Sequence, residues 1–128
     1  MRLLLDTHAL LWAWTEPAKL SETARALIQE PSNTRWVSPV TGFEISQKYR
    51  LGKLQVEPGL VSNYTDHLRT FQAEELPLLS KHALYAGGLP GEHRDPFDRL
   101  LAAQSLLEGV PLLTADPAFL GFGVQTIW

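Results

Sequence analysis

Arg2-Leu3-Leu4-Leu5-Asp6-Thr7-His8 opens the chain as a short, unbroken apolar run that ends on an acid. A continuous apolar run of this length is typical of a strand buried on both faces, as in the middle of a parallel sheet. Asp6 is then expected at the carboxyl end of that strand, where ligands of open parallel sheets bind. An Asp at this position also caps the following helix in many proteins. Both interpretations of Asp6 stay open.

Segments with strand and helix patterns alternate along the rest of the chain. Further strands are predicted at residues 35–38, 76–79, 111–115 and 124–128, and helices at residues 9–14, 21–29, 40–51, 62–72, 80–86 and 96–108. Pro77 predicts an edge position for its strand, and the two most apolar strands, which begin at Arg2 and Pro111, are expected to be central neighbours. The alternation predicts an α/β fold with three layers around a five-stranded parallel sheet.

The composition narrows the class of protein. A length of 128 residues predicts one domain over residues 1–128. The chain has no cysteine, which fits a reducing compartment, and it has neither a leader pattern nor a membrane-spanning apolar run, so a cytoplasmic protein is expected. A net charge of −3 argues against a protein that coats nucleic-acid duplexes through overall positive charge.

Acidic side chains are predicted to gather at one rim of the sheet. Asp6 and Asp116 follow strands, Asp98 lies in the first turn of a helix and Glu44 lies early in another, with Asp95 as a further acid nearby. Carboxylates placed this close repel one another unless a cation lies between them. All-oxygen ligands without cysteine favour Mg²⁺ or Mn²⁺, and such a site suggests phosphodiester chemistry.

Each acid also has a structural interpretation. Glu44 and Lys48 are four residues apart on a helix and can form a simple surface ion pair. Asp95 precedes Pro96 and fits a helix N-cap. Asp98 and Asp116 can be acids that stabilise helix starts. It is the convergence of these acids on one rim that favours a metal site.

Three runs of the sequence resemble PIN-domain proteins, specifically the VapC-type toxins of toxin-antitoxin pairs. The runs are residues 3–12 (LLLDTHALLW), residues 44–54, which begin Glu44-Ile45, and residues 93–101 (HRDPFDRLL). The resemblance extends over essentially the whole chain, including Asp116-Pro117-Ala118-Phe119 and the terminal Trp128.

The resemblance implies a Mg²⁺-dependent endoribonuclease that is neutralised by a cognate antitoxin. The implied catalytic and metal-binding residues are Asp6, Glu44, Asp98 and Asp116, with Asp6 and Asp98 first among the metal ligands; Asp95, Thr7 and Thr41 are expected to support them. The predicted reaction is hydrolysis of RNA by a metal-activated water. A homodimer is also expected, because the family forms dimers and because the first two helices carry large apolar side chains: Trp12, Trp14, Leu20 and Leu27.

The chain differs from the family pattern at two positions. Ala115 stands where the family often has Arg, and Thr41 stands where it usually has Ser. Ala115 lacks a group that can contact a phosphate, so its effect is expected on substrate binding more than on metal binding.

Other classes of protein fit less well. A PIN-like adaptor without catalytic activity is the main alternative, and retention of all the acids argues against it. A response-regulator receiver needs an acceptor Asp after its third strand, where Leu79-Ser80 stands. A phosphotransferase with an aspartyl nucleophile needs an acid two residues after Asp6, where His8 stands.

Overall fold

The structure of the chain is a computed structural model that describes residues 1–91 and 95–128. His93 and Arg94, which belong to the family resemblance, lie outside the described residues. The elements follow in the order β1 (Arg2–Leu5), α1 (Thr7–Thr15), the 3₁₀ helix η1 (Pro17–Lys19), α2 (Glu22–Gln29), β2 (Thr34–Val37), α3 (Pro39–Arg50), α4 (Pro58–Ser62), α5 (Tyr64–Thr70), β3 (Ala73–Glu75), α6 (Ser80–Gly88), α7 (Pro96–Glu108), β4 (Leu112–Leu113), the 3₁₀ helix η2 (Pro117–Phe122) and β5 (Thr126–Ile127).

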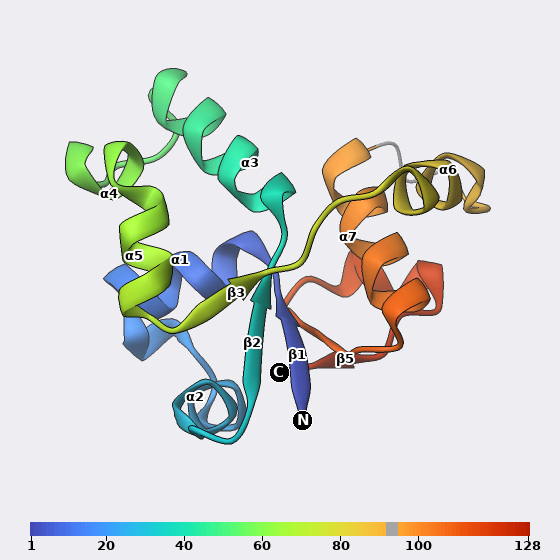
Figure 1. Cartoon of the computed structure of the whole chain (residues 1–128), viewed down its shortest axis with the longest axis horizontal. Coiled ribbons are helices and arrows are strands. Elements are labelled where there is room, and N and C mark those ends of the chain that lie inside the picture. The colour runs from blue at the N-terminus through green and yellow to red at the C-terminus, as the bar shows by residue number, and fades with distance from the viewer. Residues whose placement is uncertain (92–94) are drawn as a thin grey trace.

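The strands form one parallel sheet of five strands in the order β3-β2-β1-β4-β5. β1 lies in the middle, and Leu5 is in register with Val37 of β2 and with Leu113 of β4. Helices lie on both sides of the sheet (Figure 1). The predicted α/β class, the five-stranded parallel sheet and the central pairing of the two most apolar strands are confirmed.

The alternation of side chains along β1 produces a core on each face of the sheet. Leu3 and Leu5 belong to a cluster with α1, α2 and α5, whereas Leu4 belongs to a second cluster with α7 and Phe119 of η2. All three leucines are fully buried, and complete burial stabilises the fold by roughly 1.5–3 kcal/mol for each such side chain. The opening run is therefore held from both sides, which fixes the position of Asp6 at its end.

The third strand was predicted at the wrong residues. The prediction was residues 76–79, but β3 is Ala73–Glu75, at the edge of the sheet beside β2. The Leu76 N–H donates the last hydrogen bond of this ladder, to the Val37 carbonyl at 2.9 Å. Pro77 has no N–H and cannot continue the pairing. Pro77 thus marks where the edge strand has ended, not its interior.

The helix predicted at residues 62–72 corresponds to α5, and a separate helix, α4, which was not predicted, precedes it and ends before Asn63. Asn63 has φ −114° and ψ 32°, which departs from helical backbone. The first of these helices begins at Pro58, a residue whose fixed φ and missing N–H suit the first helical position. The 3₁₀ helices η1 and η2 were not predicted, and each has Pro at its first turn.

The large apolar side chains of α1 and α2 are buried or partly buried against the core of the chain itself. Leu20 is buried, and Trp12, Trp14 and Leu27 pack against the core. These side chains thus contribute to the core of the single chain, and the expected homodimer stays a prediction. The described large apolar residues that are most exposed lie elsewhere, for example Leu84 of α6. No helix among the described residues has the length and apolar character needed to cross a membrane.

Candidate functional site

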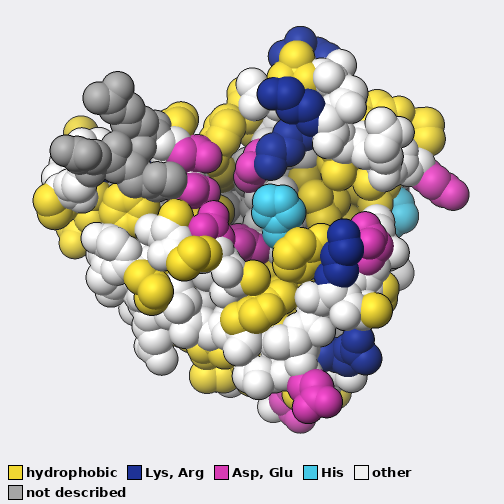
Figure 2. All heavy atoms as spheres, turned by 180° about the vertical axis from the view of Figure 1, so that it is seen from behind, with side chains coloured by type: hydrophobic (Ala, Val, Ile, Leu, Met, Phe, Trp, Pro, Cys, Tyr) yellow, Lys and Arg dark blue, Asp and Glu magenta, His cyan; other side chains and the backbone are white. Residues whose placement is uncertain are grey.

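The acidic residues singled out from the sequence line one cavity of about 130 Å³. This acidic cavity is lined by Asp6, Thr7, His8, Glu44, Lys48, Asp95, Asp98, Leu101, Asp116 and Phe119. The residues come from the ends of β1 and β4, from α1 and α3, and from the start of α7. On the face shown in Figure 2, acidic side chains gather at the floor of a notch. The folded chain therefore brings the predicted acids together, as parallel strands that end at one rim should.

Asp6 is both a helix cap and a buried acid of this cavity. Its Oδ1 accepts the Ala9 N–H at 2.8 Å, and its Oδ2 accepts the Thr114 hydroxyl at 2.5 Å. The residue is only 5% exposed. Burial raises the pKa of the Asp6 carboxyl above its ordinary value, and the two hydrogen bonds and His8 offset part of this rise. A buried carboxylate with a raised pKa is a group that a nearby cation would stabilise.

Glu44 is held by two partners. The Thr7 hydroxyl donates to Oε1 at 2.6 Å, and the Lys48 ammonium lies 2.8 Å from Oε2. Thr41, which is fully buried, has its hydroxyl 3.3 Å from that of Thr7. The Glu44–Lys48 pair expected from the spacing exists, but the Glu44 side chain is only 13% exposed, so it is not a simple surface pair.

The remaining acids lie at helix starts. Asp95 is the N-cap of α7 and accepts from the Phe97 N–H at 2.9 Å, and Asp98 lies in the first turn of the same helix. Asp116 is exposed and caps η2 through the Ala118 N–H at 2.9 Å. The structural interpretation of these acids is therefore correct. Capping orients the carboxylates of Asp95 and Asp116, and all three acids also line the cavity.

The donor set of the acidic cavity fits a hard divalent cation. Its lining includes five carboxylates, and the basic groups in the lining are Lys48 and His8. The oxygen ligands are those that Mg²⁺ and Mn²⁺ prefer. Within residues 1–91 and 95–128, no group of three or more acidic, histidine or cysteine side chains is arranged to hold an ion. The chemistry of the lining thus fits a metal.

Thr114 is a site residue that was not singled out from the sequence. Besides its bond to Asp6, its hydroxyl accepts the Asp116 N–H at 3.0 Å, so it links two of the acids. A signal for it was present, because Thr114 lies near the end of the strand expected beside the first one and precedes Asp116 by two residues. Hydroxyl residues at such strand ends are well placed to orient a neighbouring carboxylate.

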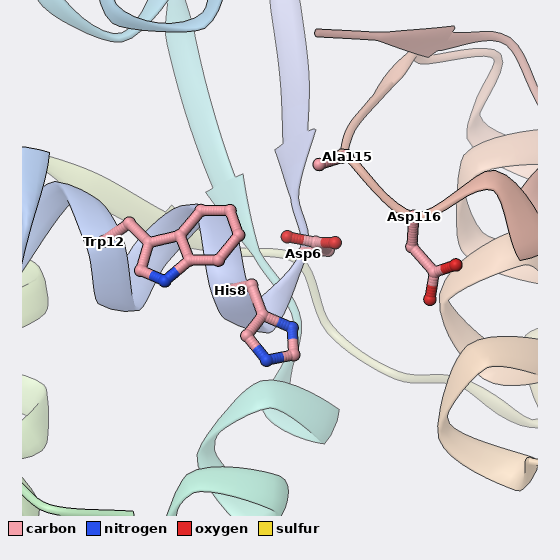
Figure 3. Close-up of a pocket in the computed structure, with 5 residues that line it drawn as sticks. All are labelled: Asp6, His8, Trp12, Ala115 and Asp116. Atoms are coloured by element: carbon pink, nitrogen blue, oxygen red, sulfur yellow. The ribbon is translucent and has the colours of Figure 1, made fainter. Parts of the chain in front are cut away.

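Two further cavities adjoin the acidic one. The aromatic cavity, about 260 Å³, is lined by Asp6, His8, Trp12, Ala115 and Asp116. In Figure 3, His8 and Trp12 project from α1 on one side of Asp6, and Asp116 lies on the other side. The lysine cavity, about 200 Å³, includes His8, Trp12, Lys48 and Lys53 in its lining. Ala115, the departure from the family pattern, therefore lines the aromatic cavity.

Comparison with known proteins gives a family and a set of structural neighbours. A family model described as PIN domain matches residues 3–123. A search of curated proteins found no match. Among solved structures, the chain is similar to a chain in the crystal structure of VapBC2 from Rickettsia felis bound to a promoter DNA fragment, with 18% identity and a TM-score of 0.70 over 99% of this chain and 98% of that one.

Two other solved structures give the same result. A chain of VapBC-1 from nontypeable Haemophilus influenzae matches with 18% identity and a TM-score of 0.69, over 99% of this chain and 97% of that one. A chain of a toxin-antitoxin complex from Klebsiella pneumoniae matches with 15% identity and a TM-score of 0.66, over 98% of this chain and 96% of that one. At identities of 15% and 18%, the similarity to these structures shows a shared fold only.

Proposed function

The chain belongs to the PIN-domain family, and we propose that it is a metal-dependent endoribonuclease, the toxin of a toxin-antitoxin pair. The observation that carries the proposal is the one cavity lined by Asp6, Glu44, Asp95, Asp98 and Asp116. The proposal treats residues 1–128 as one PIN domain that acts in the cytoplasm. RNA as the substrate rests on the resemblance of the sequence motifs.

Asp6 and Asp98 are proposed to hold the metal, with Glu44 and Asp116 completing the site. Mg²⁺ or Mn²⁺ bound there supplies Lewis-acid stabilisation of phosphoryl charge and lowers the pKa of a water. Asp6 suits this role because it is buried and lies between the strands that position the rim. Burial takes the charged carboxylate out of water and destabilises it, and a bound cation would stabilise it again.

The surrounding residues keep these carboxylates in place. The Ala9 N–H and the Thr114 hydroxyl fix the two oxygens of Asp6. The Thr7 hydroxyl and Lys48 do the same for Glu44. Because each oxygen retains a further lone pair, these hydrogen bonds orient the acids without preventing metal binding. Asp95, Thr7 and Thr41 are the supporting residues of the proposal.

A protein partner forms part of the proposal. The solved structures named above are of VapBC or toxin-antitoxin complexes, and by analogy this chain is proposed to bind a cognate antitoxin. A homodimer is proposed from the resemblance of the sequence motifs. Light scattering of the isolated chain at micromolar concentration should give twice the monomer mass. The small protein encoded beside this chain should co-purify with it.

The nuclease proposal is tested by RNA cleavage with purified protein. Cleavage should require Mg²⁺ or Mn²⁺ and stop in excess chelator. Asp6→Asn should lower the rate by orders of magnitude while circular dichroism stays native, since Asn can still cap α1. Asp66→Asn is the matched control, because Asp66 is exposed on α5 and pairs with Arg69; its rate should equal that of the wild type.

Full activity of Asp6→Asn, or activity in chelator, would contradict the metal site. A protein that binds RNA yet cleaves none with either metal would support the alternative, a catalytically silent PIN-like adaptor. The cleavage rate of DNA of the same sequence, measured in parallel, shows whether RNA is the preferred substrate.

A further inference from the structure

A cavity of about 290 Å³ lies away from the functional site, between α3, α4, α5 and the end of β3. Figure 1 shows these elements on one side of the molecule. This α3–β3 cavity is lined by Pro39, Gly42, Phe43, Ile45, Ser46, Val61, Tyr64 and Glu75. None of these described residues lines the acidic, aromatic or lysine cavity. The α3–β3 cavity is therefore a separate feature of the fold.

Two aromatic rings of the lining are held from outside the cavity. Phe43 is 58% exposed, yet its ring centroid lies 5.3 Å from that of Phe97. Tyr64 meets Trp14 edge to face, with ring centroids 5.7 Å apart. Gly42 leaves room for the Tyr64 ring, because a Cβ there would lie 3.2 Å from the ring atom Cε1. Both rings are thus fixed before any ligand binds.

The cavity has one negative charge and no counter-charge. Among the described residues of its lining, Glu75 alone is charged, and its carboxylate is exposed. This carboxylate makes no ion pair or hydrogen bond with any described residue. Burial raises the pKa of the Tyr64 phenol above its ordinary value, and the charge of Glu75 adds to the rise, so the phenol stays neutral. The negative charge of the cavity therefore comes from Glu75.

We propose that the α3–β3 cavity binds an organic ammonium cation with methyl groups on its nitrogen, beside the Glu75 carboxylate and against the rings of Phe43 and Tyr64. The face of an aromatic ring attracts a cation within about 6 Å of its centroid, and rings of this kind recognise quaternary ammonium groups. The carboxylate adds the attraction of a full opposite charge.

The polar groups of the lining favour a methylated nitrogen over a primary one. A primary ammonium has three N–H donors that each need an acceptor. Besides Glu75, the lining offers the Ser46 hydroxyl, whereas the Tyr64 hydroxyl is buried and has no hydrogen-bond partner in the described part of the chain. A methylated ammonium needs fewer acceptors, and its methyl groups can pack against the rings and Val61.

The size of the cavity suits one small cation. Its volume lies at the lower end of small-molecule pockets, which begin at roughly 300 Å³. The same chemistry occurs in free choline-type molecules and in the trimethylated lysine side chain of a protein. The proposal concerns this shared ammonium group and does not depend on the proposed nuclease function.

A choline titration followed by NMR of the side-chain methyl groups tests the cavity, in chelator and without RNA. Saturable shifts are expected for the methyl groups of Ile45 and Val61, which line the cavity, and none for Leu101 of the acidic cavity. The neutral analogue of choline, with a tert-butyl group in place of trimethylammonium, has the same shape without the charge. It should bind about fivefold more weakly or worse.

Substitutions test the charge and the ring separately. Glu75→Gln should weaken choline binding by about fivefold or more. Glu74→Gln is its matched control, because neighbouring residues of a strand point to opposite faces, and it should bind as the wild type does. Phe43→Leu should weaken binding by about threefold or more. Tyr85→Leu, which removes an exposed ring from α6, is the control for Phe43→Leu and should leave binding unchanged.

Several results would overturn the proposal. They are the absence of any shift, shifts at Leu101 without shifts at Ile45 and Val61, equal affinity for the neutral analogue, or equal losses in Glu75→Gln and Glu74→Gln. Phe43 and Glu75 are both exposed, so their variants are expected to fold, and cooperative melting curves check this. A peptide with trimethyl-lysine that binds more tightly than choline would assign the ammonium group to a protein side chain, and the reverse order would assign it to a free molecule. RNA cleavage enters none of these measurements, so they leave the nuclease proposal to its own test.

Discussion

The Thr114 hydroxyl donates a hydrogen bond of 2.5 Å to Oδ2 of Asp6, although the two residues are 108 positions apart in the chain. The same hydroxyl accepts the backbone N–H of Asp116. One side chain thus joins the acids that follow β1 and β4, the neighbouring strands at the centre of the sheet. The arrangement of both acids depends on this hydroxyl.

Thr114→Val should destabilise the fold by about 1–3 kcal/mol at neutral pH, because Val keeps the shape but leaves a buried carboxylate oxygen without its donor. Urea unfolding measures the loss. The cost should be smaller in an Asp6→Asn background, where no buried charge is left without its donor. Thr70→Val, at the exposed end of α5, is the control. Equal costs for Thr114→Val in both backgrounds would show that the bond to Asp6 contributes nothing specific.

The raised pKa of Asp6 predicts how the stability of the metal-free protein depends on pH. Burial is the main cause of the rise, so the folded protein holds this proton to higher pH than the unfolded chain does. Folding stability from this group should therefore decline as pH rises from the unfolded pKa to the raised pKa. Asp6→Asn should remove that decline and melt higher than the wild type in chelator at pH 7.5. Asp66→Asn should keep the wild-type pH profile.

The sequence predicted the central part of the fold because burial there leaves a clear pattern. The apolar run at Leu3–Leu5 has to lie inside a sheet covered on both faces, and the acid after it has to lie at the rim. The long helix after Asp95-Pro96 carries its own start signals and was also correct. In these segments, local pattern and tertiary position agree.

The edge of the sheet was less predictable. Ala73-Glu74-Glu75 has no β-branched or aromatic residue, and it is a strand only because β2 offers a free edge for pairing. The side-chain contacts of the site could not be predicted from the sequence either. The bond from Thr114 to Asp6 and the place of His8 in the lining of three cavities depend on strand order, which no local pattern specifies.

Lys48 serves as a counter-charge for Glu44 in the metal-free protein. Lys48→Met should therefore lower stability by about 1 kcal/mol or more, because it leaves a carboxylate that is only 13% exposed without its cation. Lys19→Met is the matched control, since its pair with Glu16 is half exposed and should contribute less than about 0.5 kcal/mol. Chemical unfolding in chelator gives both values. Equal losses for the two variants would mean that Glu44 needs no counter-charge.

Metal binding should appear as a gain in stability that depends on Asp98. Mg²⁺ at about one hundred times its dissociation constant should stabilise the wild type by roughly 2.7 kcal/mol, or several degrees in melting temperature. Asp98→Asn should melt slightly higher than the wild type in chelator, because one of the repelling carboxylates of the acidic cavity is neutral, and it should lose most of the Mg²⁺ shift. The loss of an acid from the first turn of α7 offsets about 0.3–1 kcal/mol of that gain.

Thermal melts at pH 7.5, with chelator and with Mg²⁺, measure these differences, and Asp66→Asn should keep the whole shift. A wild type without a Mg²⁺ shift, or an Asp98→Asn variant that retains it, would mean that Asp98 only stabilises the start of its helix.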